Sequence, residues 1–215
     1  MQLPWQLRLH WLFRWTADYD CCRLVTPVLM MTRLGDERVQ RIAIDMDEVL
    51  ADTAAHQLAW YEREFGPGPT VDALRGSHLT AQVPPAHRAR IVEHLHHPQF
   101  FRDIPVMPGA VEAVQALSTR YELFVASAAM EHPVSFAAKF EWLREFFPMI
   151  PPSQCVFCGD KSIIGADYLL DDSPYQLVRF RGTPIIFTAA HNLHETRFRR
   201  VIDWPDAVAQ LLTLP

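Results

Sequence analysis

Long apolar runs, cysteine and glycine are all scarce in this 215-residue sequence. No uncharged apolar run reaches the ~18 residues that a membrane-spanning helix needs, so no membrane span is expected. The 4 cysteines are too few for the disulfide framework of a small secreted domain. The 20 Lys and Arg residues are outnumbered by 25 Asp and Glu, which gives no reason to expect a nucleic-acid polymer as partner.

Two glycine-rich nucleotide-binding signatures are also missing. The sequence contains neither G-x-x-x-x-G-K-[ST] nor G-x-G-x-x-G, which argues against the folds that bind nucleoside triphosphates and dinucleotides. Apolar residues make up 49% of the chain and charged residues 21%, so a packed globular core is expected. The length allows one domain, or one domain with a small insertion.

The amino-terminal segment, residues 1–38, differs in composition from the rest. It is rich in tryptophan and arginine and poor in acids, and Arg8 and Arg14 interrupt the apolar core that a secretory signal needs. A transit peptide or a surface amphipathic segment also fits this composition. We expect an extension outside the fold, with the functional chain beginning near Met30 or Met31, and we predict a cytoplasmic protein.

From Arg41 onward, strand-type and helix-type patterns alternate. Because such alternation indicates parallel βαβ units, the expected fold class is α/β with a doubly wound parallel sheet. Residues 66–85 are rich in Gly and Pro and are expected to form a loop. Strands are predicted at 42–44, 121–126, 155–158, 168–170 and 184–187, and helices at 53–65, 85–97, 108–118, 133–147 and 204–212.

Acidic pairs follow two of the predicted buried strands. Asp45 and Asp47 come directly after the first strand, and Asp171 and Asp172 follow the run 168–170. Ligands of open α/β sheets bind at the carboxyl ends of the strands, where these four carboxylates would share one crevice. Since clustered carboxylates repel one another without a cation, and hard oxygen ligands favour Mg²⁺ over zinc, the sequence predicts a magnesium site.

Further residues fit the binding of an anion. Ser127 and Ala128 follow the strand 121–126, where a hydroxyl and free backbone N–H groups could hold phosphate oxygens. Lys139 lies in an apolar helix, where it is either a phosphate ligand or a surface lysine that snorkels to solvent. Ser127 has no Ser-His-Asp partners in view, so acyl-hydrolase chemistry has little support.

The acidic pairs, the serine and the lysine follow one another along the chain in an order that resembles the haloacid-dehalogenase-like (HAD) phosphohydrolases. The signature of that superfamily is D-x-D, a Ser or Thr after the second strand, a Lys and an acidic pair. Further segments resemble the 5′(3′)-deoxyribonucleotidase family within that superfamily. The resemblance covers about residues 41–213. It rests on the segments 45–52, 101–110, 139–142, 159–161, 169–172 and 187–192.

The resemblance implies a role for each candidate residue. Asp45 would attack phosphorus and form an aspartyl-phosphate, and its ordinary pKa of ~3.9 leaves it ionised without a base. Asp47 would protonate the leaving oxygen, a task that needs a raised pKa, which nearby carboxylates favour. The implied Mg²⁺ ligands are Asp45, the main-chain carbonyl of Asp47 and Asp171, with Asp172 ordering that shell. Ser127, Ala128 and Lys139 would bind the phosphoryl group.

The resemblance also implies an architecture. The core would comprise 39–53 and 106–215, with a small helical cap at 54–105 inserted after the first strand. The strand that precedes Asp45 would lie centrally, beside the strands that precede Ser127 and Asp171. The expected substrate is a small phosphomonoester, foremost a deoxyribonucleoside 5′- or 3′-monophosphate, and a homodimer is one expected assembly.

One position departs from the familiar nucleotidases. An aromatic residue follows their Ala-Asp pair, whereas Thr53 follows Ala51-Asp52 here. A base-reading pocket normally depends on aromatic stacking, so the departure weakens the nucleotide assignment but not the phosphatase assignment. The alternatives are a HAD phosphatase for another small phosphate ester, or a catalytically silent phosphate-binding or regulatory protein.

Two other clusters are set aside. Cys155 and Cys158 have C-x-x-C spacing, but a redox pair usually opens a helix and these flanks are of strand type, so buried structural thiols are expected. His94, His96 and His97 are expected on the solvated end of a helix rather than around a metal.

Overall fold

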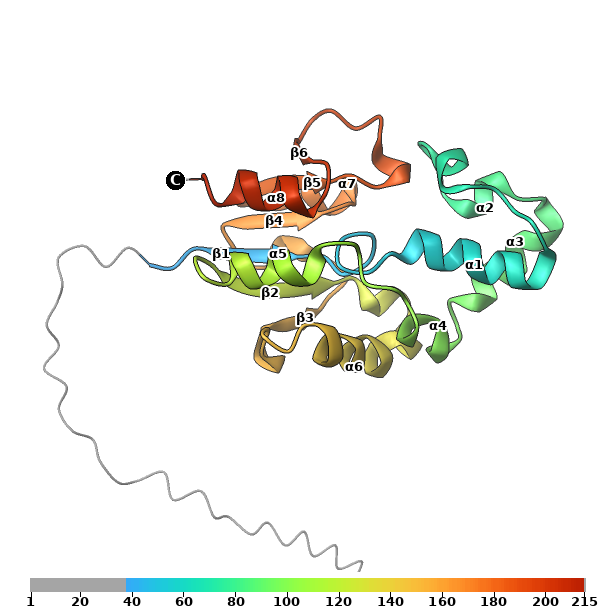
Figure 1. Ribbon diagram of the computed structural model, residues 1–215, viewed down its shortest axis with the longest axis horizontal. Helices are drawn as coiled ribbons and strands as arrows, with labels where there is room; N and C mark the ends of the chain where they lie inside the picture. Colours follow the sequence, from blue (N-terminus) through green and yellow to red (C-terminus); the bar gives the residue numbers. More distant parts are fainter. Residues whose placement is uncertain (1–37, 215) are drawn as a thin grey trace, which may run out of the picture. The chain divides into compact units, whose positions relative to one another are not determined.

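The fold is described by a computed structural model of residues 38–214 (Figure 1). Its centre is a six-stranded sheet in the order β3-β2-β1-β4-β5-β6, and all neighbouring strands are parallel. The predicted fold class and the predicted central place of β1, between β2 and β4, are confirmed. The strands are β1 Arg41–Ile44, β2 Glu122–Ser127, β3 Cys155–Phe157, β4 Tyr168–Asp171, β5 Thr183–Phe187 and β6 Arg199–Val201.

Helices lie in three of the connections between these strands and after β6. They are α1 Thr53–Phe65, α2 Leu79–Gln82, α3 Pro85–His94, α4 Pro98–Arg102, α5 Ala110–Leu117, α6 Phe136–Phe146, α7 Pro174–Leu177 and α8 Trp204–Leu211. The expectation of a plain loop at 66–85 is wrong, because this stretch contains a 3₁₀ turn at Val71–Leu74 and helix α2. Among residues 38–214, no helix has the length and apolar character needed to cross a bilayer.

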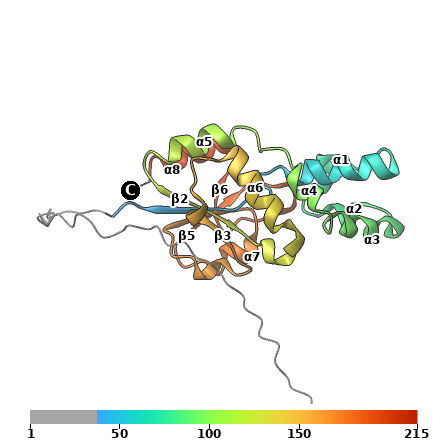
Figure 2. The ribbon, with the colours of Figure 1, turned by 90° about the horizontal axis from the view of Figure 1, so that it is seen from below.

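The sheet is buried on both faces, as Figure 2 shows with helices above and below it. Alternate residues of one strand enter different cores: Ile42 and Ile44 pack with α5, α6 and α8, whereas Ala43 packs with α7. This alternation follows from the period-two geometry of a strand and explains why residues 42–44 of β1 are all apolar. The strand is therefore fixed in register and depth, which fixes the position of Asp45 after it.

The helical insertion, residues 54–105, projects beyond the carboxyl end of β1 (Figure 1). Its first helix, α1, begins where the Asp52 carboxylate accepts a hydrogen bond from the Ala55 N–H, and it ends at Gly66 with a φ of +81°. The insertion has a small core of its own, formed by Tyr61, Leu74, Leu79, Val83 and Ile91.

The insertion also contacts the core far from its entry point. The Gly76 N–H donates to the Ala190 carbonyl at 2.8 Å, and the His78 ring stacks on His191 with the ring centroids 4.9 Å apart. Gly76 has a φ of +73°, and a Cβ there would lie 2.7 Å from the His194 ring, so this close approach requires glycine. The division into a leader at 1–38, a core and a cap stays a prediction, and residues 1–37 of the leader lie outside the described residues.

Candidate active site

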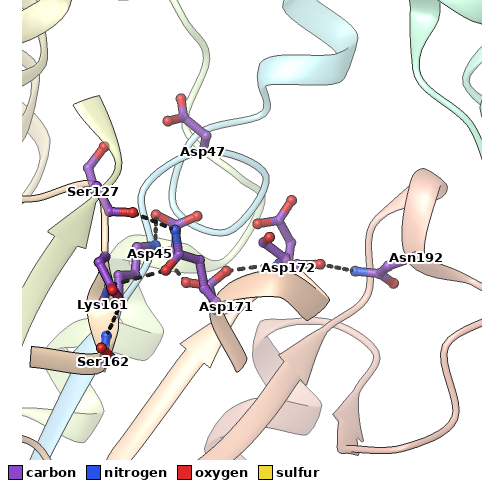
Figure 3. Close-up of polar contacts among 12 residues, drawn as sticks. Asp45, Asp47, Ser127, Lys161, Ser162, Asp171, Asp172 and Asn192 are labelled. Carbon is purple, nitrogen blue, oxygen red and sulfur yellow. Dashed lines mark hydrogen bonds and ion pairs between the residues drawn. The ribbon is translucent and has the colours of Figure 1, made fainter. Parts of the chain in front are cut away.

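A buried carboxylate–lysine centre lies at the carboxyl ends of the two middle strands (Figure 3). Since β1 and β4 pair in parallel and the Asp45 N–H donates to the Leu170 carbonyl, Asp45 and Asp171 leave the sheet side by side. The Lys161 Nζ lies 2.6 Å from Asp45 Oδ1 and 2.5 Å from Asp171 Oδ2, and the whole Lys161 side chain is 1% exposed. One ammonium thus bridges two carboxylates from neighbouring strands.

Burial dominates the electrostatics of this centre. It raises the pKa of Asp45 to about 7, a change that Lys161 opposes and that Asp171 and Asp47 reinforce. Burial acts to lower the pKa of Lys161, but Asp45 and Asp171 outweigh it and the pKa rises. Lys161 is therefore a fixed positive charge, whereas the charge of Asp45 depends on which cations lie beside it.

Asp172 completes a group of three buried acids. One carboxylate oxygen from each of Asp45, Asp171 and Asp172 lies within 4.8 Å of the others. Burial and the neighbouring acids raise the pKa of Asp172 well above its ordinary value. Asn192 fixes the backbone here, since its Nδ2 donates to the carbonyls of Asp172 and Phe187, both at 2.8 Å.

The donor set fits a hard divalent cation. Three converging carboxylate oxygens are ligands that Mg²⁺ prefers, and Lys161 alone does not balance their charge. Asp45 and Asp171 were predicted as direct ligands and Asp172 as a residue that orders the shell. In the structure, an Asp172 oxygen lies within the same 4.8 Å limit, so Asp172 is also a candidate direct ligand.

A second lysine, Lys139, connects Asp47 with the strand β2. Its Nζ donates to Asp47 Oδ2 and, at 3.2 Å, to the Ser127 Oγ, and the lysine is 2% exposed. The Asp47 carboxylate is turned away from Asp45 in Figure 3. The two acids of the D-x-D pair therefore contact different lysines, Lys139 and Lys161. Lys139 is thus not a surface lysine, and three predicted residues meet through it.

The expected rise in the pKa of Asp47 is wrong for this structure. Burial acts to raise it, but the Lys139 ammonium and its hydrogen bond outweigh burial and lower the pKa. Thr53 adds a smaller effect in the same direction, because its Oγ1 donates to Asp47 Oδ1 at 3.3 Å.

A pocket of about 340 Å³ opens between these residues and the helical insertion. Asp47, Ala128, Lys139 and Asp172 line it from the core, and Asp45, which is 6% exposed, adjoins the lining residues. On the side of the insertion, the lining includes Thr53 at the start of α1 and, from the insertion itself, Gln57, Ser77, His78, Leu79, Leu95 and Phe101. Such a volume suits a small organic phosphate, with the phosphate at the charged side and the rest under the insertion.

The predicted site residues therefore come together, and one important residue was given no role. Asp45, Asp47, Ser127, Ala128, Lys139, Asp171 and Asp172 all belong to the centre or to the pocket. Lys161 lay within the segment 159–161 used for the resemblance, but its part in the site was not recognised. Its position just after the strand 155–158 was the available signal.

The two clusters set aside are accounted for. Cys155 and Cys158 are free, partly buried thiols at β3 and just after it. The expectation of a solvated helix end is wrong for His94, which is buried because its ring packs against Trp60 and its Nε2 lies 2.6 Å from Glu64 Oε2. His96 and His97 are exposed, as expected. Among residues 38–214, the acid group is the one set of potential metal ligands, so no histidine site competes with it.

The strand order, the helical insertion and the acids at the strand ends define a HAD-like hydrolase fold. A haloacid dehalogenase-like hydrolase from Streptococcus pneumoniae has this fold with a TM-score of 0.54 and 11% identity, over 80% of this chain and 98% of that one. A HAD-hydrolase from Bacillus subtilis, solved bound to magnesium, gives a TM-score of 0.53 at 11% identity. The match covers 82% of this chain and 100% of that one. These likenesses establish the fold alone.

The chain belongs to the family described as 5′ nucleotidase, deoxy (Pyrimidine), cytosolic type C protein, whose model matches residues 38–214. The 5′(3′)-deoxyribonucleotidase of Bacillus subtilis strain 168 is 38% identical over 177 residues, covering 80% of this chain and 98% of the relative. A relative from Staphylococcus aureus strain Mu50, which carries the name 5′(3′)-deoxyribonucleotidase provisionally, is 50% identical over 165 residues. The match covers 77% of this chain and 91% of the relative. The family is one of phosphatases, so the expected enzyme class is confirmed.

Proposed function

We propose that this protein is a Mg²⁺-dependent 5′(3′)-deoxyribonucleotidase that hydrolyses deoxyribonucleoside monophosphates through an aspartyl-phosphate on Asp45. The observation that carries the proposal is the buried Asp45–Lys161–Asp171 centre beside a pocket that Lys139 and Ala128 line. The names of the relatives support the substrate class. A cytoplasmic location and a homodimer stay predictions.

Asp45 is the nucleophile in this proposal. It extends from a strand that is buried on both faces, so its carboxylate is held at one depth relative to the pocket. Lys161 favours the ionised form of the carboxylate, against the effect of burial, and orients it through a 2.6 Å contact. Lys161 and Asp171 are positioning residues here, and their arrangement lowers the cost of orienting the attacking oxygen.

The metal ligands are Asp45, Asp171 and Asp172, whose oxygens converge. When bound there, Mg²⁺ supplies positive charge that neutralises the phosphoryl oxygens and the three carboxylates. The main-chain carbonyl of Asp47, which the family resemblance implies, is the fourth candidate ligand.

Asp47 is the proton donor to the leaving oxygen, and Lys139 governs when it can donate. In the structure, Lys139 contacts Asp47 and Ser127 together and lowers the pKa of Asp47. A phosphate dianion held by Ser127 would draw the ammonium toward itself and add negative charge beside Asp47. Both changes raise the pKa of Asp47, so substrate binding itself prepares the acid.

The test is phosphate release from a substrate panel. The panel contains deoxyribonucleoside 5′- and 3′-monophosphates, ribonucleotides, sugar phosphates and 4-nitrophenyl phosphate, each with Mg²⁺ and with a chelator. We expect Mg²⁺-dependent release with the highest kcat/KM on a deoxyribonucleotide. A higher kcat/KM on a sugar phosphate would show that sugar phosphates, not nucleotides, are the substrate class. If no member of the panel released phosphate, the protein would be a catalytically silent phosphate-binding protein. Full activity after exhaustive chelation would contradict the metal.

A further inference from the structure

Glu48, the residue after the D-x-D pair, has an unusual backbone. Its φ is +59°, and within residues 38–214 it is the one non-glycine residue with a positive φ. The loop is tight: the N–H groups of Leu50 and Ala51 both donate to the Met46 carbonyl, and the Glu48 N–H donates to the Ala51 carbonyl. The left-handed region disfavours residues with a Cβ, so glutamate here is strained where glycine would not be.

Glu48 is among the residues that line the substrate pocket. Its Oε1 accepts a hydrogen bond from the Ala54 N–H at the start of α1. Asp45, Asp47 and Asp171 each contact a lysine, whereas no Lys, Arg or His of residues 38–214 pairs with Glu48. Its second oxygen has no hydrogen-bond partner within the same residues.

Helix capping does not account for this glutamate by itself. Asp52 is already the N-cap of α1, and its Oδ1 accepts the Ala55 N–H at 3.1 Å. Asp52 is not among the residues that line the pocket, whereas Glu48 is. The two acids therefore share a role toward the same helix but differ in their access to substrate.

The surroundings of Glu48 decide which part of a substrate it can face. Ser127 and Lys139 lie together on the phosphate side, and neither forms a hydrogen bond or ion pair with Glu48, whose partner is the Ala54 N–H at the start of α1. Asp47, its chain neighbour, is the proposed proton donor to the leaving oxygen. Glu48 is thus placed beside the first atoms of the leaving group, where it can accept a hydrogen bond from an O–H or N–H.

We propose that Glu48 is a specificity-determining residue that accepts a hydrogen bond from a donor on the leaving alcohol. In a nucleoside monophosphate, this donor is the sugar hydroxyl that the phosphate does not occupy. The inference rests on the proposed nucleotidase function and extends it, because Glu48 then selects leaving groups by a hydroxyl that aryl phosphates lack.

The test compares kcat/KM for thymidine 5′-monophosphate with that for its 3′-deoxy analogue, and uses 4-nitrophenyl phosphate as a third substrate. For the wild type, we expect a preference of up to about tenfold for thymidine 5′-monophosphate, the effect of one ordinary hydrogen bond. Glu48→Met keeps the length of the side chain but cannot accept this bond, so the preference should fall to about one. Glu48→Gly, which also relieves the positive φ, should give the same loss.

Asp52→Ala is the matched control, because it removes the cap of the same helix from outside the pocket. We expect a lower Tm with the hydroxyl preference retained. An unchanged preference in both Glu48 variants, or the same loss in Asp52→Ala, would overturn the role of Glu48 alone. If the wild type hydrolysed 4-nitrophenyl phosphate but neither nucleotide, the proposed function would fail, and the sugar hydroxyl would fail with it as the partner.

Discussion

The two sides of the substrate pocket differ in chemistry. On the core side, acids at the strand ends are held by two lysines that are almost fully buried. On the insertion side, the lining is made of neutral or weakly basic residues such as Thr53, Gln57 and His78. The difference suggests a division of labour. The charged side handles the phosphoryl group that all phosphomonoesters share, and the other side handles the part in which substrates differ.

The two sides also differ in how they are held in place. Asp45 and Asp171 extend from paired central strands, whose register leaves them little freedom. The insertion has its own small core and meets the other side of the pocket through Gly76 and His78. Substitutions on the core side should therefore affect turnover most, and substitutions on the insertion side should affect selectivity.

The largest expected effect comes from Asp45→Asn. The amide keeps the shape of the side chain but removes the nucleophilic charge, so kcat should fall by about 10⁴-fold or more. The measurement is kcat at saturating Mg²⁺ and substrate, with folding checked by circular dichroism. Asp72→Asn is the control, because Asp72 pairs with Arg75 at the surface, away from the pocket, and should leave kcat close to wild type. A folded Asp45→Asn enzyme with wild-type turnover would contradict the covalent mechanism.

Removal of Mg²⁺ is expected to have the next largest effect. Without the cation, the oxygens of Asp45, Asp171 and Asp172 repel one another, so chelation should remove activity and lower Tm. A cation at a hundred times its Kd stabilises the folded state by about 2.7 kcal/mol. The measurement is Tm as a function of Mg²⁺ concentration for the wild type and for Asp171→Asn. Equal shifts in the two proteins would place the metal elsewhere.

The two lysines should differ in their effect on stability. Lys161→Met leaves Asp45 and Asp171 facing each other without their cation, and breaking a buried ion pair costs about 3–5 kcal/mol. Lys139→Met should cost less, because the Asp47 side chain is 33% exposed and can be solvated. Urea unfolding of both variants in Mg²⁺-free buffer tests this order. If Lys139→Met were less stable than Lys161→Met, Lys139 would contribute more than Lys161 to the free energy of unfolding, contrary to this prediction.

The smallest effect is expected from Thr53 on the insertion side. Thr53→Phe should lower KM for a deoxyribonucleoside monophosphate by up to about tenfold if the new ring stacks on the base, since one stacking contact contributes about 1–3 kcal/mol. The KM for 4-nitrophenyl phosphate should change less. Thr53→Val controls for loss of the hydrogen bond to Asp47. A wild type that already separates thymidine from guanosine monophosphate about a thousandfold would show that another residue reads the base.

Local patterns predicted the strand ends well and long-range contacts poorly. Asp45 and Asp171 could be placed together because apolar runs ended in acids and parallel strands end at one edge. Strand β6 was missed because two of its three residues are arginines, which give no apolar pattern. It forms by pairing with the edge of β5.

Long-range contacts also explain the wrong prediction for the pKa of Asp47 and the unrecognised role of Lys161. The pKa of Asp47 depends on Lys139, which lies 92 positions away along the chain. Lys161 follows β3, and two strands separate β3 from β4, yet its side chain reaches Asp171 at the end of β4. The sequence pattern around Lys161 does not show that its side chain extends past two strand ends to reach Asp171.

The most direct test of the account is a search for the covalent intermediate. Asp47→Asn should still allow attack by Asp45 on an aryl phosphate, whose leaving group needs little protonation, but should slow hydrolysis of the intermediate. After mixing with 4-nitrophenyl phosphate and Mg²⁺ and quenching in acid, mass spectrometry should find one added phosphoryl group, on the peptide that contains Asp45. Phosphate release without any labelled protein, or label on another residue, would contradict the account.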